Sequence, residues 1–130
     1  MIILSLRTDK PEAEIGIFDG VEEMAYVRWE AHRQLAETLH QKIQELLQSK
    51  EYKWSDINGV VVFSGPGSFT GLRIGVAVAN ALGMALHIPV MGVGNEDWIT
   101  AGTQRLLSGE NQRIVTPAYG SDAHITAPKK

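Results

Sequence analysis

The sequence contains no cysteine among its 130 residues. Disulfide bonds, thiolate nucleophiles and cysteine-ligated metals are therefore excluded. Cysteine usage also gives no indication of whether the protein resides in an oxidising or a reducing compartment. An excess of positive charge is also missing, because 15 acidic residues outnumber 12 basic ones and the formal net charge is −3. A chain with this balance has no long-range field that attracts polyphosphate, so we expect it not to bind nucleic acid by itself.

Long hydrophobic runs are scarce too. The apolar stretch that ends at Leu86 is bounded by Arg73 and His87, and it falls short of the roughly 20 residues that span a bilayer. The opening residues 1–6 are apolar but lack the basic leader and cleavage site of a signal peptide. They are better explained as a buried first strand, and we expect a cytoplasmic protein that does not enter a membrane.

The residues that are present fit one globular domain with a single core, given the length and a hydrophobic content of 44%. Short apolar or alternating runs at 2–6, 14–18 and 23–29 predict three strands in an antiparallel meander, separated by turn dipeptides. Leucines and isoleucines at helical spacing predict an amphipathic helix over 33–49. The β-branched run 59–63 is the clearest strand.

A glycine-rich loop follows that strand and leads into an apolar helix over 72–86. Residues 87–93 are predicted to return as a further strand, which implies a parallel crossover. A third helix is expected over 95–107, started by Asn95 as N-cap, with a weakly structured tail after it. The sequence thus predicts an α/β fold with a mixed sheet.

The glycine-rich loop invites comparison with phosphate-binding loops, because backbone N–H groups at a strand-to-helix junction favour an anion. The Walker A pattern fails, since no lysine stands at the required place after Gly65 or Gly67, and the dinucleotide pattern is a weak match. On motif chemistry alone, the glycines and Pro66 make a tight turn and Ser68 or Thr70 caps the helix.

The same stretch resembles the signature of the TsaB (YeaZ) family. It reads Gly65, Pro66, Gly67, Ser68, Phe69, Thr70, Gly71, Leu72, Arg73, Ile74, Gly75. The resemblance continues through residues 79–83 and 88–93, and backwards through the His32 helix to the opening strand. It covers about the first 107 residues, so we predict a TsaB-like N-terminal domain over 1–107 and an extended tail over 108–130.

The resemblance implies an actin-like, ribonuclease H-like fold of the sugar kinase and heat-shock ATPase superfamily. It also implies a non-catalytic scaffold that pairs with TsaD in making threonylcarbamoyladenosine at adenine 37 of tRNA. A TsaE-like ATPase is a further partner that the resemblance allows, and tRNA is expected only through the complex. We accordingly expect no catalytic residue, no metal and no cofactor in this chain.

Two departures from the family pattern bear on function. The superfamily places a metal-binding Asp at the end of the first strand, where this chain has Arg7, and a guanidinium cannot ligate Mg²⁺. Asp9 shares a face with Arg7 and is expected to pair with it. The second domain of typical members is also missing, while residues 113–120 resemble their closing tail, so we expect an internal deletion and no two-lobed nucleotide cleft.

Two other function classes stay open at this stage. A degenerate nucleotide-binding phosphotransferase is suggested by the fold and the loop, and ATP or ADP is expected to bind weakly or not at all. A glycoprotease-like hydrolase needs an activated nucleophile, but Ser64, Ser68 and Thr70 have no neighbouring histidine in sequence. The loop hydroxyls are therefore interpreted as turn and cap residues.

The resemblance also implies a docking mode, a four-helix bundle with TsaD through the first helix and the helix after the loop. The expected partner interface comprises His32, Leu35, Leu39, Ile43, Gly75, Ala79, Leu82 and Gly83. Small residues at every fourth position from Gly71 to Gly83 allow close backbone approach, either of a partner or of the first helix of the same chain. Without TsaD the surface is expected to form a homodimer, and Ala79→Leu to weaken both assemblies.

Overall fold

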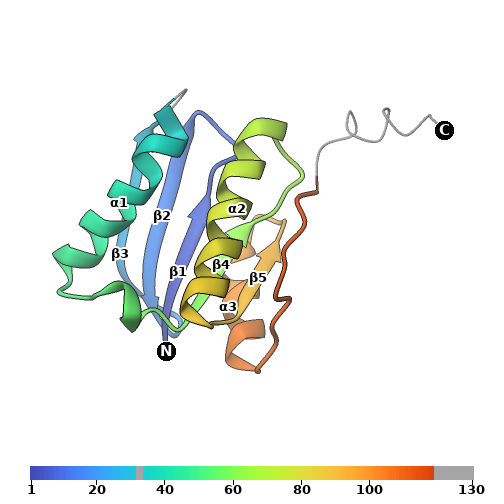
Figure 1. Cartoon of the computed structure of the whole chain (residues 1–130). Helices are drawn as coiled ribbons and strands as arrows, with labels where there is room; N and C mark the ends of the chain where they lie inside the picture. The colour runs from blue at the N-terminus through green and yellow to red at the C-terminus, as the bar shows by residue number, and fades with distance from the viewer. Residues whose placement is uncertain (32–33, 119–130) are drawn as a thin grey trace.

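The computed structural model describes residues 1–31 and 34–118. Three strands come first, β1 (Ile2–Arg7), β2 (Glu12–Asp19) and β3 (Glu22–Glu30), and helix α1 (Leu35–Ser49) follows them. A 3-10 turn, η2 (Trp54–Asp56), leads to β4 (Gly59–Phe63), and the remaining elements are α2 (Phe69–Leu86), β5 (Val90–Val93) and α3 (Trp98–Leu107). Figure 1 shows these elements as one sheet with helices packed on it.

The five strands form one sheet in the order β3-β2-β1-β4-β5. β1 pairs antiparallel with β2, and β2 pairs antiparallel with β3, which confirms the predicted meander. β1 pairs parallel with β4, and β4 pairs parallel with β5, which confirms the parallel crossover through α2. The predicted α/β architecture with a mixed sheet is therefore present, with β1 at its centre.

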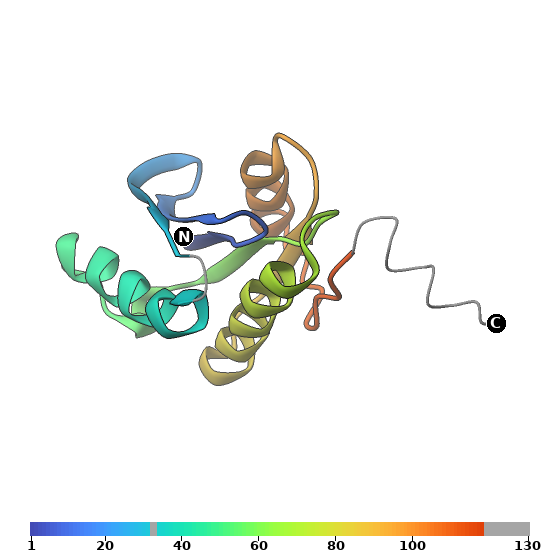
Figure 2. The same cartoon turned by 90° about the horizontal axis from the view of Figure 1, so that it is seen from above.

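The helices cover the two faces of the sheet unequally. Figure 2 shows α1 and α2 on one face and α3 on the other. α1 places a leucine or isoleucine on the sheet at every turn, since Leu35, Leu39, Ile43 and Leu47 are all buried. α3 covers the face of β4, where Trp98 meets Phe63 edge to face with ring centroids 6.0 Å apart.

Over β2 and β3, no helix among the described residues covers this second face, and side chains from the strands themselves fill it. Tyr26 packs edge to face on Phe18 and donates a 2.5 Å hydrogen bond to the Glu14 carboxylate. Burial, and then the hydrogen bond to Glu14, raise the pKa of the Tyr26 phenol. Arg28 lies over the Tyr26 ring and closes this layer from the solvent side.

Besides shifts of one or two residues at β1, β2, β3 and α1, the starts of three further elements differ from the prediction. α2 begins inside the loop at Phe69, and Ser68 is its N-cap without a side-chain hydrogen bond, so neither Ser68 nor Thr70 caps it as expected. β5 begins at Val90 rather than at residue 87, because His87 ends α2 in a left-handed conformation with φ 57°. The last difference is at α3.

α3 begins at Trp98 rather than Asn95, and Asp97 is its N-cap. Residues 95–97 form a turn instead, in which the Trp98 N–H donates to the Asn95 carbonyl oxygen at 3.2 Å. Trp98 is only 4% exposed, so burial of its ring sets where the helix starts. None of the helices in the described part of the chain combines the length and hydropathy needed to cross a membrane.

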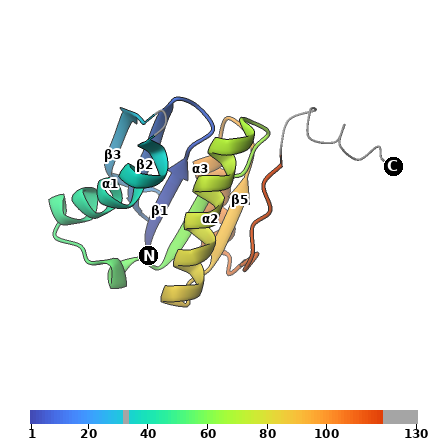
Figure 3. The ribbon, with the colours of Figure 1, turned by 45° about the horizontal axis from the view of Figure 1, so that its top comes forward.

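The segment after α3 runs back along β5, the outer strand of the sheet. Figure 3 shows it beside β5 and rising toward the end of the sheet where α2 begins. Residues 111–118 contain no helix or strand, yet Val115 is only 3% exposed and belongs to the core under α1 and α2. The predicted tail therefore includes a packed portion, and the rest of it, residues 119–130, lies outside the described residues.

Candidate functional site

The glycine-rich loop joins β4 to α2 and is held at close range by the rest of the fold. Gly65 has φ 112°, a left-handed conformation that side chains disfavour. A side chain at Gly71 would collide with the Thr8 backbone, and one at Gly75 would collide with the Thr8 side chain. The Thr8 hydroxyl also donates to the Gly71 carbonyl oxygen at 2.7 Å. The glycines therefore let the first turns of α2 lie directly on the end of β1.

The end of β1 carries an ion pair in place of a free carboxylate. Arg7 donates from Nε to one Asp9 oxygen at 2.8 Å and from a terminal nitrogen to the other at 3.3 Å. The guanidinium also lies 3.8 Å from the centre of the Phe63 ring. The predicted pairing of Arg7 with Asp9 is thus confirmed. The Asp9 side chain, only 8% exposed, sits against Gly67 of the loop.

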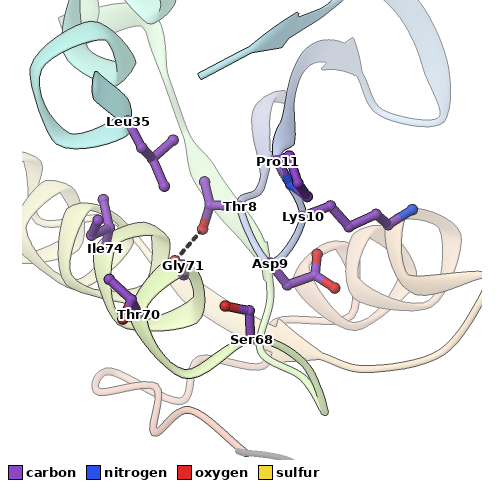
Figure 4. A pocket seen from close by; sticks show the side chains of 9 residues that line it. All are labelled: Thr8, Asp9, Lys10, Pro11, Leu35, Ser68, Thr70, Gly71 and Ile74. Carbon is purple, nitrogen blue, oxygen red and sulfur yellow. Dashed lines mark hydrogen bonds between the residues drawn. The ribbon is translucent and has the colours of Figure 1, made fainter. Parts of the chain in front are cut away.

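A cavity of about 270 Å³ opens beside this pair, between the start of α1, the β1–β2 turn and the start of α2. Its lining residues are Thr8, Asp9, Lys10, Pro11, Leu35, Ser68, Thr70, Gly71 and Ile74. Figure 4 shows Leu35 and Ile74 on one side, Asp9 and Ser68 on the other, and the Lys10 side chain extending away from α2. We call this cavity the loop pocket.

The chemistry available in the loop pocket is modest. Ser68 and Thr70 offer hydroxyl groups, but no histidine is among the lining residues to act as a general base on them. The Asp9 carboxylate is engaged by Arg7. Across residues 1–31 and 34–118, no group of three or more His, Asp or Glu side chains is placed to hold a metal ion. The pocket can therefore bind a polar group through hydrogen bonds. Its lining residues do not form a recognisable set of catalytic groups.

The structure brings the predicted signature residues together. Residues 65–68 form the loop, and residues 69–73 form the first turn of α2. Ser68, Thr70 and Arg73 are exposed, whereas Gly65 is buried. The side chain of Phe69 lies outside the described part of the chain.

The predicted partner interface requires a correction, because most of it faces inward. Leu35, Leu39 and Ile43 are 6%, 0% and 0% exposed and pack in the cores beneath α1. Gly75 lies on Thr8, and Ala79 is 0% exposed. The inward direction follows from packing: only residues this small allow α2 to approach the sheet so closely.

The remaining interface residues have different positions. Gly83 also faces the sheet, since a side chain there would collide with Val90. Leu82 is half-buried and packs against the core under α1 and α2. His32 lies outside the described residues. The small-residue stripe thus packs against the end of β1 and against the chain's own sheet.

The sequence reasoning expected a partner to cover α2 but did not single out the residues of its outer face. Ala77, Ala81 and Ala85 are exposed there at every fourth position, beside Met84, which is 69% exposed. The signal was available, because a helix with so few charges is expected to be covered all round. The sequence could not show which face of α2 meets the sheet, since the inner and outer stripes of small residues have the same spacing.

The overall fold defines the class of this protein. It matches the structure of Thermus thermophilus RuvC in complex with a Holliday junction substrate with a TM-score of 0.51, covering 72% of this chain and 64% of that chain at 11% identity. A similarity at this identity shows the fold alone. The chain thus has the predicted actin-like, ribonuclease H-like fold.

Closer relatives define the family. A family model described as TsaD, tRNA N6-adenosine threonylcarbamoyltransferase, matches residues 27–116. The tRNA threonylcarbamoyladenosine biosynthesis protein TsaB of Escherichia coli (strain K12) is 32% identical over 78 residues, covering 55% of this chain and 34% of that protein. YeaZ from Pseudomonas aeruginosa matches with a TM-score of 0.67 at 26% identity, covering 72% of this chain and 44% of that chain. The chain belongs to the TsaD family and, within it, groups with the TsaB (YeaZ) proteins.

The chain is much shorter than these relatives. It spans 38%, 34% and 49% of the length of three of the curated proteins that it matches.

Proposed function

We propose that the chain is a non-catalytic scaffold subunit in the synthesis of threonylcarbamoyladenosine on tRNA, and that it pairs with a TsaD-like protein. The family and the names of the relatives support the pathway. The observation that carries the pairing is the outer face of α2, where Ala77, Ala81, Met84 and Ala85 are exposed and uncharged; exposed Arg73 lies on the same face, one turn before Ala77. Exposed apolar helix faces of this kind mark sites of association.

The small size of these side chains suits helix-to-helix docking. Alanine at every fourth position makes a flat strip along α2, so another helix can approach its backbone closely. Half-buried Ile74 and Val78 border the strip on its inner side. α1 lies on the same face of the sheet as α2 (Figure 1) and exposes mainly polar residues. The docking surface is therefore an apolar strip along α2, with the polar outer side of α1 on the same face of the sheet.

The pairing is tested by co-expression with a TsaD-like protein from the same genome, one of the two being tagged. We expect the wild-type pair to co-elute. Ala81→Glu places a charge in the centre of the strip and should weaken the complex by more than tenfold, because an unpaired charge is costly to bury. Thr100→Glu is the matched control, since Thr100 is exposed on α3, on the opposite face of the sheet.

The outcomes of this experiment separate two failures. If the wild-type proteins elute apart at tens of micromolar while both are folded, the scaffold proposal fails. If Ala81→Glu binds as tightly as Thr100→Glu, the pairing stands but α2 is not the docking surface. A TsaE-like ATPase is added as a third component in the same assay, and tRNA binding is expected only when the partner is present.

The loop pocket keeps a nucleotide-binding phosphotransferase as the second candidate. The non-catalytic proposal predicts weak binding of ATP or ADP or none, because Arg7 already neutralises Asp9. Calorimetric titration of the chain with nucleotide and Mg²⁺ measures this directly. Saturable binding at micromolar concentration, with a matching rise in melting temperature, would favour the phosphotransferase instead.

A further inference from the structure

Asn80 is a polar residue in the middle of α2 that neither the sheet nor the proposed partner accounts for. Its side-chain amide donates to the Val115 carbonyl oxygen at 3.0 Å, and its oxygen accepts from the Val115 N–H at 2.9 Å. The two residues are 35 positions apart in the chain. Both polar groups of the Asn80 amide are thus used to hold the backbone of one buried residue, in the manner of a neighbouring strand.

The segment that contains Val115 also seals the outer edge of β5. Val90 donates to the side-chain oxygen of Asn111 at 3.0 Å, and Gly92 donates to that of Gln112 at 2.8 Å. The Gln112 N–H in turn donates to the Val90 carbonyl oxygen at 3.0 Å. These groups satisfy an edge that would otherwise present free backbone donors and acceptors. We call residues 111–118 the strap.

The end of the strap reaches the glycine-rich loop. The Ala118 N–H donates to the Ser64 carbonyl oxygen at 2.6 Å, and the Ala118 carbonyl oxygen occupies the space that a side chain at Gly65 would need. Ser64 and Gly65 are the first residues of the loop, directly after β4. The strap therefore packs directly against Gly65, the loop residue that has the left-handed conformation.

The rest of the loop continues from this contact to the wall of the loop pocket. Gly67 lies against Asp9, and Ser68 and Thr70 line the pocket itself. A contiguous path thus joins Asn80 to the pocket through Val115, Ala118 and the stem of the loop. Because the strap is held by a few hydrogen bonds and one buried valine, it is expected to open more readily than the sheet.

We propose that the strap is a clamp that sets the conformation of the glycine-rich loop, and that Asn80 is the positioning residue that keeps the clamp closed. Opening of the strap loosens residues 64–71 and with them one wall of the loop pocket. The inference is independent of the proposed pairing with a TsaD-like protein, since it concerns contacts within this chain. Its test needs no partner.

The test is hydrogen–deuterium exchange of the full chain, followed by mass spectrometry. Asn80→Ala should raise the exchange of residues 113–118 and 64–71 at least tenfold and leave β1, β2 and β3 within twofold of the wild type. Asn58→Ala is the matched control, because the Asn58 side chain also accepts a hydrogen bond from a backbone N–H, that of Ile2 at 2.8 Å. It should leave residues 64–71 unchanged.

A second variant isolates the contact between strap and loop. Ala118→Pro removes the donor to Ser64 at an exposed residue and leaves Asn80 and Val115 in place. It should raise exchange of residues 64–71 while Val115 stays protected. If loop exchange in Ala118→Pro stays within twofold of the wild type, the proposal is overturned. This outcome decides the question even if Asn80→Ala unfolds the whole chain. Unchanged loop exchange in a folded Asn80→Ala variant overturns the role of Asn80.

Discussion

At the scale of single residues, small side chains on α2 serve two different purposes. Gly75 and Ala79 let the helix lie directly on the sheet, where even a methyl group at Gly75 would collide with Thr8. Ala77 and Ala81 are exposed, so their size is not required by the fold. The same residue type is therefore under a packing constraint on one side of the helix and free for association on the other.

Substitution by leucine distinguishes the two sides. Ala79→Leu should lower the free energy of unfolding by about 1–3 kcal/mol, because Ala79 is 0% exposed and the sheet cannot yield without strain. Ala81→Leu is the control and should change it by less than about 0.5 kcal/mol, as is usual for exposed positions. Urea unfolding of both variants measures the difference. Equal unfolding free energies would mean that Ala79 does not pack on the sheet.

At the scale of elements, the two ends of α2 are held differently, the first by a tertiary contact and the second by a backbone cap. Ser68 makes no side-chain hydrogen bond at the N-cap, and Thr8 instead fixes the first turn through Gly71. At the other end, His87 adopts a left-handed conformation, and the Ile88 N–H donates to the Gly83 carbonyl oxygen. That position usually holds glycine, since other L-residues are strained there.

Replacing His87 with glycine should therefore stabilise the chain. His87→Gly removes the strain of the left-handed conformation, and we expect a gain of about 1 kcal/mol in the free energy of unfolding. Ala85→Gly, two residues earlier and also exposed, should instead cost about 1 kcal/mol, as glycine does inside a helix. Chemical denaturation of the pair measures both signs. If His87→Gly lost as much stability as Ala85→Gly, the conclusion that His87 is strained in its left-handed conformation would be wrong.

At the scale of the whole molecule, the sheet is covered on one face by α1 and α2 and on the other by α3 (Figure 2), with strand side chains such as Phe18 and Tyr26 packed beside it. The apolar strip on α2 is part of the outer surface of this assembly. In the absence of a TsaD-like protein, a second copy of the chain can meet it about a two-fold axis, because each copy presents the same strip.

We accordingly expect a homodimer in the purified protein. Light scattering at tens of micromolar should give twice the mass of the 14.3 kDa chain. Ala81→Glu should give a monomer, since two strips bearing carboxylates repel each other across the axis, while Thr100→Glu should remain dimeric. A monomeric wild type would show that the strip is not self-complementary, without bearing on its affinity for a TsaD-like protein.

Local patterns in the sequence determined the strands of the meander, the sheet-facing leucines of α1 and the crossover through α2, because periodicity reports directly which residues share a face. The pairing of Arg7 with Asp9 was also predictable, since the two are only two positions apart. The resemblance of residues 65–75 identified the family, because a long contiguous motif survives where overall identity is low.

Tertiary structure alone decided which face of α2 meets the sheet. Both faces repeat small residues at the same spacing, so nothing local distinguishes Gly75 and Ala79 from Ala77 and Ala81. It also decided where α3 begins, through burial of Trp98. The strap is the clearest case, because Asn80 and Val115 are 35 residues apart, and a hydrogen bond between a side chain and a distant backbone leaves no periodic trace in a sequence.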